Sequence, residues 1–410
     1  MAVATRLSVL ITHPGRQHSH QAAIALANAG MLAGYWSGVP AVAAEAGWVP
    51  RRAWSRYDPI AIPATLARSA VWVPALRRLG DRLPRRLARR ADFLACRLFD
   101  RWAAARLAGT AASAVIACEI SALTTFRRAR RLGMVTILDA PSIHHREQDR
   151  VQPTLDSPSL HREIADVKDA EIEAADFILT VSELARDSYI AHGAAAERVL
   201  SLTLGADAGL FAAAMTGPSP SEPLTFLFAG AAIHRKGLDL ALDAFAAARA
   251  TTPGARLRIV GPPGEATPLA IGRPGVEVVG ALSQRGLADE LAHAHCLVLP
   301  SRHDSFGMVV VEALAAGTPV LISDMVGAKD FVSEGENGWI VPMNDLGALT
   351  DRMRWCLTHP DLLVAMRPRC RAAAREATWQ SYHRRLQDAL LVRLSHAAEA
   401  SAAHDALIQA

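Results

Sequence analysis

The sequence has little cysteine and little charge. Its five cysteines are odd in number, widely spaced and without a CxxC pair, which argues against a disulfide framework or a zinc ribbon and favours a reducing compartment. Charged residues make up only 20% of the 410 residues, whereas 51% are hydrophobic, which excludes a disordered chain. A chain of this length exceeds one hydrophobic core, so we expect two domains of roughly 200 residues each.

Several catalytic and targeting signatures are also missing. The sequence has no GxGxxG after an expected strand, no P-loop, no HExxH zinc motif and no GxSxG nucleophile elbow. These absences argue against a dinucleotide oxidoreductase, a zinc hydrolase and a serine hydrolase. The early apolar run 7–12 is too short for a signal peptide, so we expect a cytoplasmic protein. Residues 17–44 carry no charge, but polar residues, Gly and Pro interrupt them, which favours a buried helix and strand over a membrane span.

Positive charge is concentrated between Arg51 and Arg106. This segment holds fourteen arginines and four aspartates, which gives it a net charge of +10. The whole chain has a net charge of +4, so the rest of the chain carries −6. Aromatic residues such as Trp72 and Trp102 interleave with the arginines. The pattern is typical of a helix on an anionic membrane surface, and equally of a solvated helical face in an arginine-rich protein. No nucleic-acid-binding motif accompanies the charge, so we expect no nucleic-acid partner.

Short apolar runs alternate with helical stretches along the chain, a pattern typical of parallel sheets covered by helices. The expected strands are Ser8–Thr12, Ala33–Ser37, Ala114–Cys118, Val135–Leu138, Phe177–Val181, Val199–Leu202, Leu224–Ala229, Arg256–Val260, Val276–Val279, Cys296–Leu299, Val320–Ile322 and Trp339–Val341. Residues 215–223 are rich in Pro, Gly and Ser and predict a linker.

We therefore expect an α/β fold of two Rossmann-like, doubly wound domains facing each other across a cleft. The first spans 1–214 and contains the basic helical segment 51–106, and the second spans 224–380. A helical tail, 381–410, follows. Ligands bind such sheets at the carboxyl ends of their strands, so the cleft is the expected site.

The most informative stretch runs from the strand at Cys296–Leu299 into a loop and a helix. The helix is expected to open near residue 306, which frees backbone N–H groups for an anion, those of Phe306, Gly307 and Met308. Asp304 and Glu312, eight residues apart, can present two carboxylates to one elongated ligand, and carboxylates are strong acceptors for sugar hydroxyls. An acidic pair of this spacing is usually solvated surface, but the strand–loop–helix context favours a binding site.

A second cluster follows the strand at Leu224–Ala229. Its loop begins at Gly230 and contains the adjacent cations Arg235 and Lys236 at the entrance of a helix. Two cations there can neutralise a diphosphate and stabilise it as a leaving group without a metal. Taken alone, the cluster also fits an exposed basic loop.

Together these motifs resemble those of a family 4 retaining glycosyltransferase of the GT-B fold, the glycosyltransferase group 1 type. Asp304 to Glu312 is similar to the E-x7-E signature of that family, and Arg235-Lys236-Gly237 is similar to its diphosphate-binding basic pair. Further similar landmarks are Val181-Ser182-Glu183, Gly205-Ala206-Asp207 with Phe211, and Asn337–Val341. The resemblance covers residues 175–350 well and the first 150 residues loosely.

The resemblance implies roles for the residues of the carboxyl half. Glu312 would accept hydrogen bonds from the donor ribose, and Asp304 with the amides after it would hold the transferred sugar. Arg235 and Lys236 would bind the diphosphate, and Gly230 and Met308 would line the donor site.

In the amino half, the resemblance implies that Gly15 lines the cleft between donor and acceptor. It also implies an active-site histidine after a mid-domain strand, for which His144 is the first candidate and Asp139 the second. The chain departs from the family pattern at Asp304, where Glu is usual, at Ala231, where Arg is usual, and in the Gly15 loop, which lacks a glycine pair.

The function implied is transfer of a sugar, with retention, from a UDP- or GDP-linked donor to an acceptor hydroxyl, without a metal or other cofactor. The basic segment favours a glycan or lipid-linked acceptor in cell-envelope synthesis, and a peripheral position on the inner face of the cell membrane. The alternative is a non-catalytic protein that binds nucleotide sugars or anionic lipids. A GT-B phosphorylase or epimerase is a further alternative.

Overall fold

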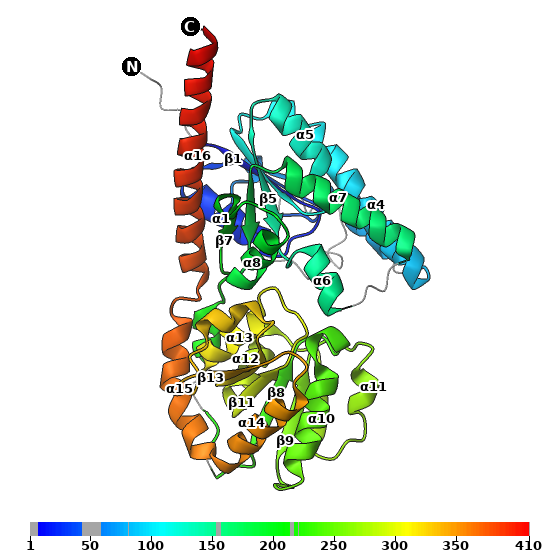
Figure 1. The fold of residues 1–410 in the computed structure, drawn as a ribbon, viewed down its shortest axis with the longest axis vertical. Helices are drawn as coiled ribbons and strands as arrows, with labels where there is room; N and C mark the ends of the chain where they lie inside the picture. Colours follow the sequence, from blue (N-terminus) through cyan, green and yellow to red (C-terminus); the bar gives the residue numbers. More distant parts are fainter. Residues whose placement is uncertain are drawn as a thin grey trace.

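The computed structural model describes residues 7–42, 59–80, 82–152, 157–213, 217–219 and 221–409. These residues form two α/β domains, each built on a parallel sheet, which confirms the expected fold class (Figure 1). The expected basic segment and the expected linker lie partly outside the described residues, at 51–58 and at 215–216. Asp81 and Pro220 also lie outside them.

The N-terminal domain contains a seven-stranded sheet in the order β3-β2-β1-β4-β5-β6-β7, with every neighbouring pair parallel. Its strands are β1 (Val9–His13), β2 (Leu32–Ser37), β3 (Ala67–Ser69), β4 (Ala114–Cys118), β5 (Val135–Ala140), β6 (Phe177–Thr180) and β7 (Val199–Ser201). Its helices are α1 (Ser19–Asn28), α3 (Trp72–Gly80), α4 (Arg85–Ala104), α5 (Leu123–Arg131), α6 (His145–Val151), α7 (Pro158–Ala174) and α8 (Glu183–Ala191).

The C-terminal domain contains a six-stranded sheet in the order β10-β9-β8-β11-β12-β13, again parallel throughout. Its strands are β8 (Thr225–Ala229), β9 (Arg256–Val260), β10 (Val276–Gly280), β11 (Cys296–Leu299), β12 (Val320–Ser323) and β13 (Gly338–Val341). The helices packed around it are α9 (Ala208–Ala212), α10 (Leu238–Arg249), α11 (Thr267–Ala270), α12 (Gln284–His293), α13 (Met308–Ala316), α14 (Leu346–Thr358) and α15 (Pro360–Ala374).

All twelve expected strands form, with ends that differ by at most two residues. Most of their apolar residues are buried, as strands covered by helices on both faces require, whereas the edge strand β10 leaves Val278 exposed. One strand, β3, has no counterpart among the expectations. It is a three-residue edge strand in which only Ala67 is buried, so it carries no apolar run that a sequence pattern could reveal.

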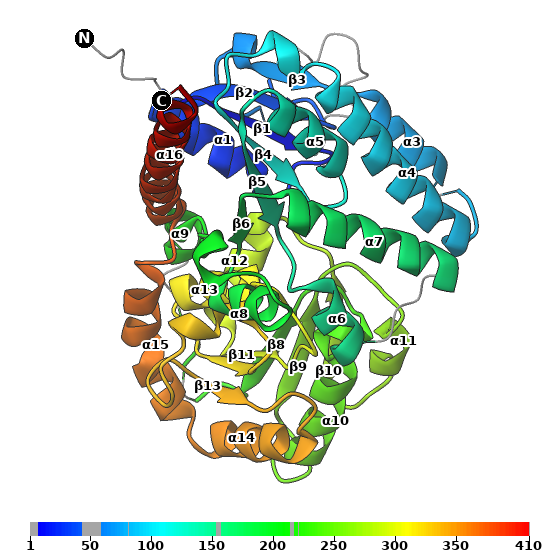
Figure 2. The same ribbon diagram turned by 45° about the horizontal axis from the view of Figure 1, so that its top comes forward.

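The chain crosses between the domains twice, and neither crossing is where the composition predicts it. The first lies near Gly205, ahead of the expected linker at 215–223, because α9 already packs against α12 and α13 and buries Phe211 in the C-terminal domain. The second lies at Thr378, after which the last helix, α16 (Trp379–Gln409), runs back along α1 of the N-terminal domain (Figure 2).

Helix α16 is therefore part of the N-terminal domain and not a separate tail. Leu386, Leu390 and Leu394 are buried, and three side chains of the helix bond to the domain that it covers. His383 shares a hydrogen bond with Gln21 at 2.9 Å, the Arg385 guanidinium group donates to the Thr203 carbonyl at 2.8 Å, and the Gln387 amide donates to a backbone carbonyl of α1 at 2.7 Å.

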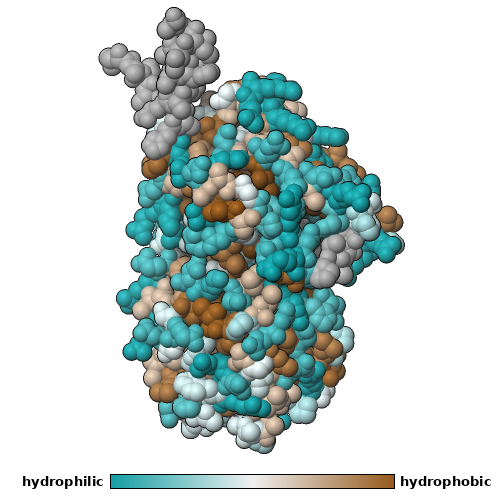
Figure 3. All heavy atoms as spheres, in the orientation of Figure 1, coloured by the Kyte–Doolittle hydropathy of each residue, from teal (hydrophilic) through white to brown (hydrophobic). Residues whose placement is uncertain are grey.

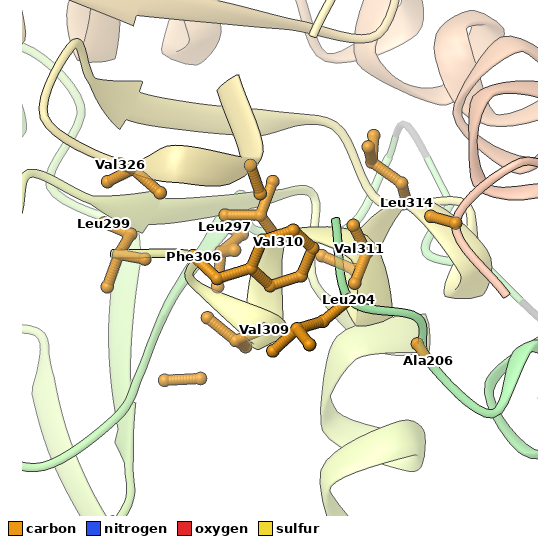
Figure 4. Packing of buried hydrophobic residues seen from close by; sticks show 14 of the residues in the cluster. Leu204, Ala206, Leu297, Leu299, Phe306, Val309, Val310, Val311, Leu314 and Val326 are labelled. Carbon is orange, nitrogen blue, oxygen red and sulfur yellow. The ribbon is translucent and has the colours of Figure 1, made fainter. Parts of the chain in front are cut away.

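Helix α13 is buried in the hydrophobic core, next to the first crossing. Every residue from Val309 to Ala316 is buried, and Figure 4 shows Phe306, Val309 and Val310 packed with Leu204 from the first crossing. Apolar packing on all sides holds the amino-terminal end of α13 in a defined position, which matters because that end opens toward the space between the domains.

Within the described residues, no helix has both the length and the apolar character needed to cross a membrane. The face seen in Figure 3 is mostly hydrophilic where α4, α5 and α7 form the shoulder of the N-terminal domain.

Candidate active site

A cleft of about 1070 Å³ separates the two domains, at the carboxyl ends of both sheets, as expected. Its C-terminal wall is built from the segments that follow β8, β9 and β11 and from the start of α13. Its N-terminal wall is built from the loop after β1, the segment after β5, and helices α4 and α6. The charged side chains that line it are Arg85, Arg89, Asp149, Arg235, Lys236, Asp304 and Glu312.

The amino-terminal end of α13 forms one side of the cleft. Gly307 caps the helix with φ of +87°, a left-handed conformation, and a Cβ there would lie 2.6 Å from Val326 Cγ1, so the position requires glycine. Within the described chain, the backbone N–H groups of Phe306, Gly307 and Met308 make no hydrogen bond. These groups and the positive end of the helix dipole face the cleft, where the sequence predicts an anion site.

Glu312 lies two turns into α13, with its carboxyl group at the cleft. The residue is 7% exposed, and burial raises its pKa to about 7. Among the described residues it has no ion-pair partner to offset this burial. A carboxylate in this state gains from any ligand that brings hydroxyl donors to it.

The basic loop after β8 contacts the acidic motif directly. Lys236 Nζ forms an ion pair with Asp304 Oδ2, and Arg235 Nη1 donates to the His303 carbonyl at 2.9 Å. Gly237 ends the loop at φ of +73°, where a Cβ would clash with the Pro300 carbonyl. The two motifs therefore form one site, with Gly230 beside them on the cleft wall.

The sequence-based expectations missed His18. This residue follows the loop after β1 and lines the cleft, and its Nε2 lies 3.0 Å from Asp139 Oδ1 at the end of β5. Burial alone would lower the pKa of His18, but the charge and hydrogen bond of Asp139 raise it. The same contact lowers the pKa of Asp139 despite its burial. The sequence does contain an indication of His18, because this residue comes five positions after β1, and the carboxyl end of β1 faces the cleft.

The structure places His144 and Gly15, both predicted as site residues, away from the lining of the cleft. His144 does not line the cleft, because it is buried at the start of α6, with its ring stacked between His145 and His192 at centroid distances of 4.4 and 4.6 Å. Gly15 does not line it either, because its N–H turns back to His13 Nδ1 at 2.8 Å. Asp139 lies beneath the cleft surface and reaches it through His18.

In the part of the chain that the structure describes, two groups of side chains lie close enough to share an ion, and neither is at the donor side of the cleft. The first is His13, Cys118 and Asp139, and the second is His144, His145 and Asp169. In the first, Asp139 is already bound to His18. In the second, Asp169 Oδ1 is already bound to His145 Nε2 at 2.8 Å.

The chain is similar in sequence to known glycosyltransferases. Residues 216–377 match the family model of glycosyl transferases group 1. The chain is 33% identical over 222 residues to D-inositol 3-phosphate glycosyltransferase 1 of Catenulispora acidiphila, a match that covers 48% of this chain and 53% of that protein. It is 28% identical over 265 residues to glycogen synthase of Mycobacterium tuberculosis, covering 61% of this chain and 63% of that one. The chain thus matches between half and two thirds of the length of these relatives.

Solved structures share the whole fold. Sucrose-phosphate synthase from Thermosynechococcus elongatus superposes with a TM-score of 0.67 at 19% identity, over 96% of this chain and 100% of that chain. HepE of Anabaena, solved with UDP-glucose, superposes with a TM-score of 0.63 at 14% identity, over 94% and 100%. The architecture is the GT-B fold of these proteins, as expected.

Proposed function

We propose that this chain, whose residues 216–377 form a group 1 glycosyl transferase domain, transfers a sugar from a nucleotide diphosphate sugar to an acceptor hydroxyl. The observation that carries the proposal is the convergence of Lys236, Asp304 and Glu312 on one cleft at the amino-terminal end of α13. Retention at the anomeric carbon, independence of a metal and membership of family 4 are parts of the same proposal. They rest on the resemblance of the motifs.

The residues of the C-terminal wall favour one orientation of the donor, with its ribose, diphosphate and sugar in that order along the wall. Glu312 accepts hydrogen bonds from the ribose hydroxyls, the free amides of α13 with Arg235 and Lys236 surround the diphosphate, and Asp304 holds the sugar. This order places cations and N–H groups around the phosphates, and carboxylates around the hydroxyls on either side. The UDP-glucose bound to HepE supports a donor of this class.

The ion pair of Lys236 with Asp304 prepares the site for reaction. As the anomeric carbon gains oxocarbenium character, the leaving diphosphate gains charge, and Lys236, Arg235 and the α13 amides are already aimed at that charge. Asp304 keeps the ammonium group in place until the donor binds, and then exchanges part of this contact for sugar hydroxyls.

His18 takes the place at the transferred sugar that the sequence predicts for His144. Asp139 fixes the imidazole ring through Nε2, which leaves Nδ1 for a sugar or acceptor hydroxyl in the cleft. We place the acceptor on the same face of the sugar as the leaving phosphate, where a phosphate oxygen takes the acceptor proton and no protein nucleophile is needed.

The basic segment supplies a second part of the proposal, an anionic membrane surface near the acceptor. Leucines of α3, of α4 and of the turn between them are exposed among arginines: Leu79, Leu83, Leu87 and Leu94. Apolar side chains among cations are typical of a helix that lies in a lipid headgroup layer. We propose a peripheral position on the inner face of the cell membrane, with a glycan or lipid-linked acceptor of the cell envelope.

Co-sedimentation with phosphatidylglycerol vesicles at low and high salt tests the membrane part. We expect binding at low salt that weakens at high salt, because the attraction is electrostatic. No binding to anionic vesicles at low salt would remove the membrane part and leave the transferase part untouched.

A panel of nucleotide sugars, screened by thermal stabilisation and then by release of nucleoside diphosphate, tests the transferase part. We expect one UDP- or GDP-linked sugar to stabilise the chain and to be consumed, and Lys236→Ala and Glu312→Ala to abolish both effects. Stabilisation without transfer to any acceptor would favour the non-catalytic alternative. Cleavage that requires phosphate, or interconversion of free nucleotide sugars, would favour a phosphorylase or an epimerase.

A further inference from the structure

We infer that the cleft contains a second subsite, between α4 and α6, which binds an anionic group of the acceptor, a phosphate or a carboxylate. The inference rests on the proposed function and names the chemical class of acceptor that the same cleft takes. It depends on two arginines and one glutamine of the N-terminal wall.

Arg85 and Arg89 are one turn apart on α4 and both line the cleft. Among the described residues, the Arg85 guanidinium group makes no hydrogen bond and no ion pair. Arg85 is the first residue of α4, in a first turn that contains no acidic residue and where a cation opposes the helix dipole. An anion bound to its guanidinium group would reverse this effect, and Arg89, one turn further along the same wall, adds positive charge to the cleft.

Helix α6 supplies the opposite side of the subsite with polar groups. Gln148 donates its amide to the Ile143 carbonyl at 2.7 Å, and Asp149 pairs with His161 at 3.0 Å, so both have partners. Gln152 Oε1 is buried and has no hydrogen-bond partner among the described residues, although the side chain lines the cleft. A buried acceptor without a partner is costly, and a ligand hydroxyl would satisfy it.

These contacts describe one class of ligand, a hydroxylated compound that carries an anionic group. Guanidinium groups are well matched to phosphate and carboxylate, and the amide oxygen of Gln152 is matched to a hydroxyl. In Figures 1 and 2 the amino-terminal end of α4 and helix α6 lie on the flank of the N-terminal domain that faces the C-terminal domain.

The subsite is separate from the proposed donor site. The donor phosphates face Arg235, Lys236 and the α13 amides, all in the C-terminal domain, whereas Arg85, Arg89 and Gln152 belong to the N-terminal domain. The volume of about 1070 Å³ lies at the upper end of the range for single-ligand sites, roughly 300–1,000 Å³, and leaves room for two ligands.

The test uses the full chain saturated with UDP, or with GDP if only GDP binds, so that the donor side is occupied. Calorimetric titration with inorganic phosphate, with glucose 6-phosphate and with glucose then measures the second subsite alone. We compare wild type, Arg85→Gln/Arg89→Gln, and the matched control Arg86→Gln/Arg90→Gln. The control removes the same charge from the same helical turn at positions that do not line the cleft.

We expect wild type and the control to bind phosphate, and to bind glucose 6-phosphate at least about tenfold more tightly than glucose. The Arg85→Gln/Arg89→Gln variant should lose this preference and keep its affinity for UDP. A wild type that binds no phosphate, or equal losses in both double variants, would overturn the inference.

Two further outcomes distinguish this inference from the proposed function and from binding to a membrane surface. If no nucleoside diphosphate binds to wild type, the proposed function fails, while phosphate titration of the unliganded chain still decides whether Arg85 and Arg89 bind an anion. Vesicles of phosphatidylglycerol and phosphatidylcholine distinguish a lipid headgroup from a soluble anion. Loss of vesicle binding in Arg85→Gln/Arg89→Gln, with phosphate binding retained, would assign the two arginines to the membrane surface and overturn the inference.

Discussion

At the scale of single residues, Glu312 shows a conflict between stability and binding. Burial raises its pKa from 4.5 to about 7, so its folded form binds a proton more tightly than its unfolded form. The stability from this residue is fully present below pH 4.5 and is lost as the pH rises through 7. The carboxylate of Glu312 therefore lowers the stability of the folded protein near neutral pH.

We expect Glu312→Gln to be more stable than wild type by about 3 kcal/mol at pH 8, and by much less at pH 5. The reason is that glutamine removes the cost of ionisation while it keeps the shape of the side chain. The same variant should lose thermal stabilisation by the nucleotide donor. Urea unfolding at both pH values measures the first effect, and an equal difference at pH 5 and pH 8 would contradict it.

A second prediction concerns the pair of His18 and Asp139. Asp139→Asn should lower the pKa of His18, because the carboxylate that raises it is gone, and should reduce kcat/KM at least about tenfold through loss of ring orientation. His18→Ala should reduce it to a similar extent. Titration of the His18 ring by NMR is the measurement, and an unchanged midpoint in Asp139→Asn would show that the contact does not set its protonation.

The pair also shows what a sequence pattern could not resolve in the site. Asp304, Glu312, Arg235 and Lys236 lie in two local motifs, and the resemblance of these motifs to a known family implied that they share one site. The contact of His18 with Asp139 joins residues 121 positions apart in the chain, and only the pairing of β1, β4 and β5 brings them together.

At the scale of elements, the loop before α10 depends on one glycine. Gly237 has φ of +73°, and a Cβ there would clash with the Pro300 carbonyl, so the turn that carries Arg235 and Lys236 cannot form around a larger residue. The same loop is held by Arg302, whose guanidinium group binds both carboxylate oxygens of Asp239 at 2.7 and 2.9 Å.

We expect Gly237→Ala to lower the free energy of unfolding by at least about 2 kcal/mol and to weaken donor binding. The control is Gly272→Ala, at φ of +76° but with no atom within 4 Å of the added Cβ. It should cost about 1 kcal/mol, the backbone strain alone, and leave binding unchanged. Equal losses in the two variants would show that the contact with Pro300 is not decisive.

Elements with their own apolar run could be predicted, and those without one could not. Strands such as β4 and β9 coincide with the expected ranges because four or five residues of alternating or continuous apolar character mark them. The short β3 has no such mark. The first crossing, near Gly205, could not be predicted from composition either, because the Pro- and Ser-rich stretch comes only after α9, which already packs in the C-terminal domain.

At the scale of the whole molecule, buried neutral histidines set the response of the N-terminal domain to acid. Burial lowers the pKa of His13 to about 4 and that of His144 to about 3, the latter with help from His145 and His192. Both folded values lie below 6.5, so the stability that depends on the neutral rings is present above pH 6.5 and is lost as the pH falls toward 4. His18, with its raised pKa, acts in the opposite direction.

We expect wild type to lose on the order of 1 kcal/mol of stability per pH unit for each of the two histidines between pH 6 and pH 4.5. His144→Asn keeps a residue that can cap α6 and removes one titrating group, so its stability should fall less steeply over this range. Thermal unfolding at pH 7.5, 6 and 4.5 measures the slopes. Parallel slopes in the two proteins would exclude His144 as a source of acid sensitivity.

The two crossings lie against each other. Ala206 pairs with Thr378 in an isolated parallel bridge, and the Ala206 N–H donates to the Ala377 carbonyl at 2.8 Å. Because both connections between the domains pass through this one place, we expect rotation of the domains about it to be easier than sliding along it. Trp379, next to the bridge, lines the cleft and would sense that rotation, which makes its fluorescence a natural reporter of closure around a donor.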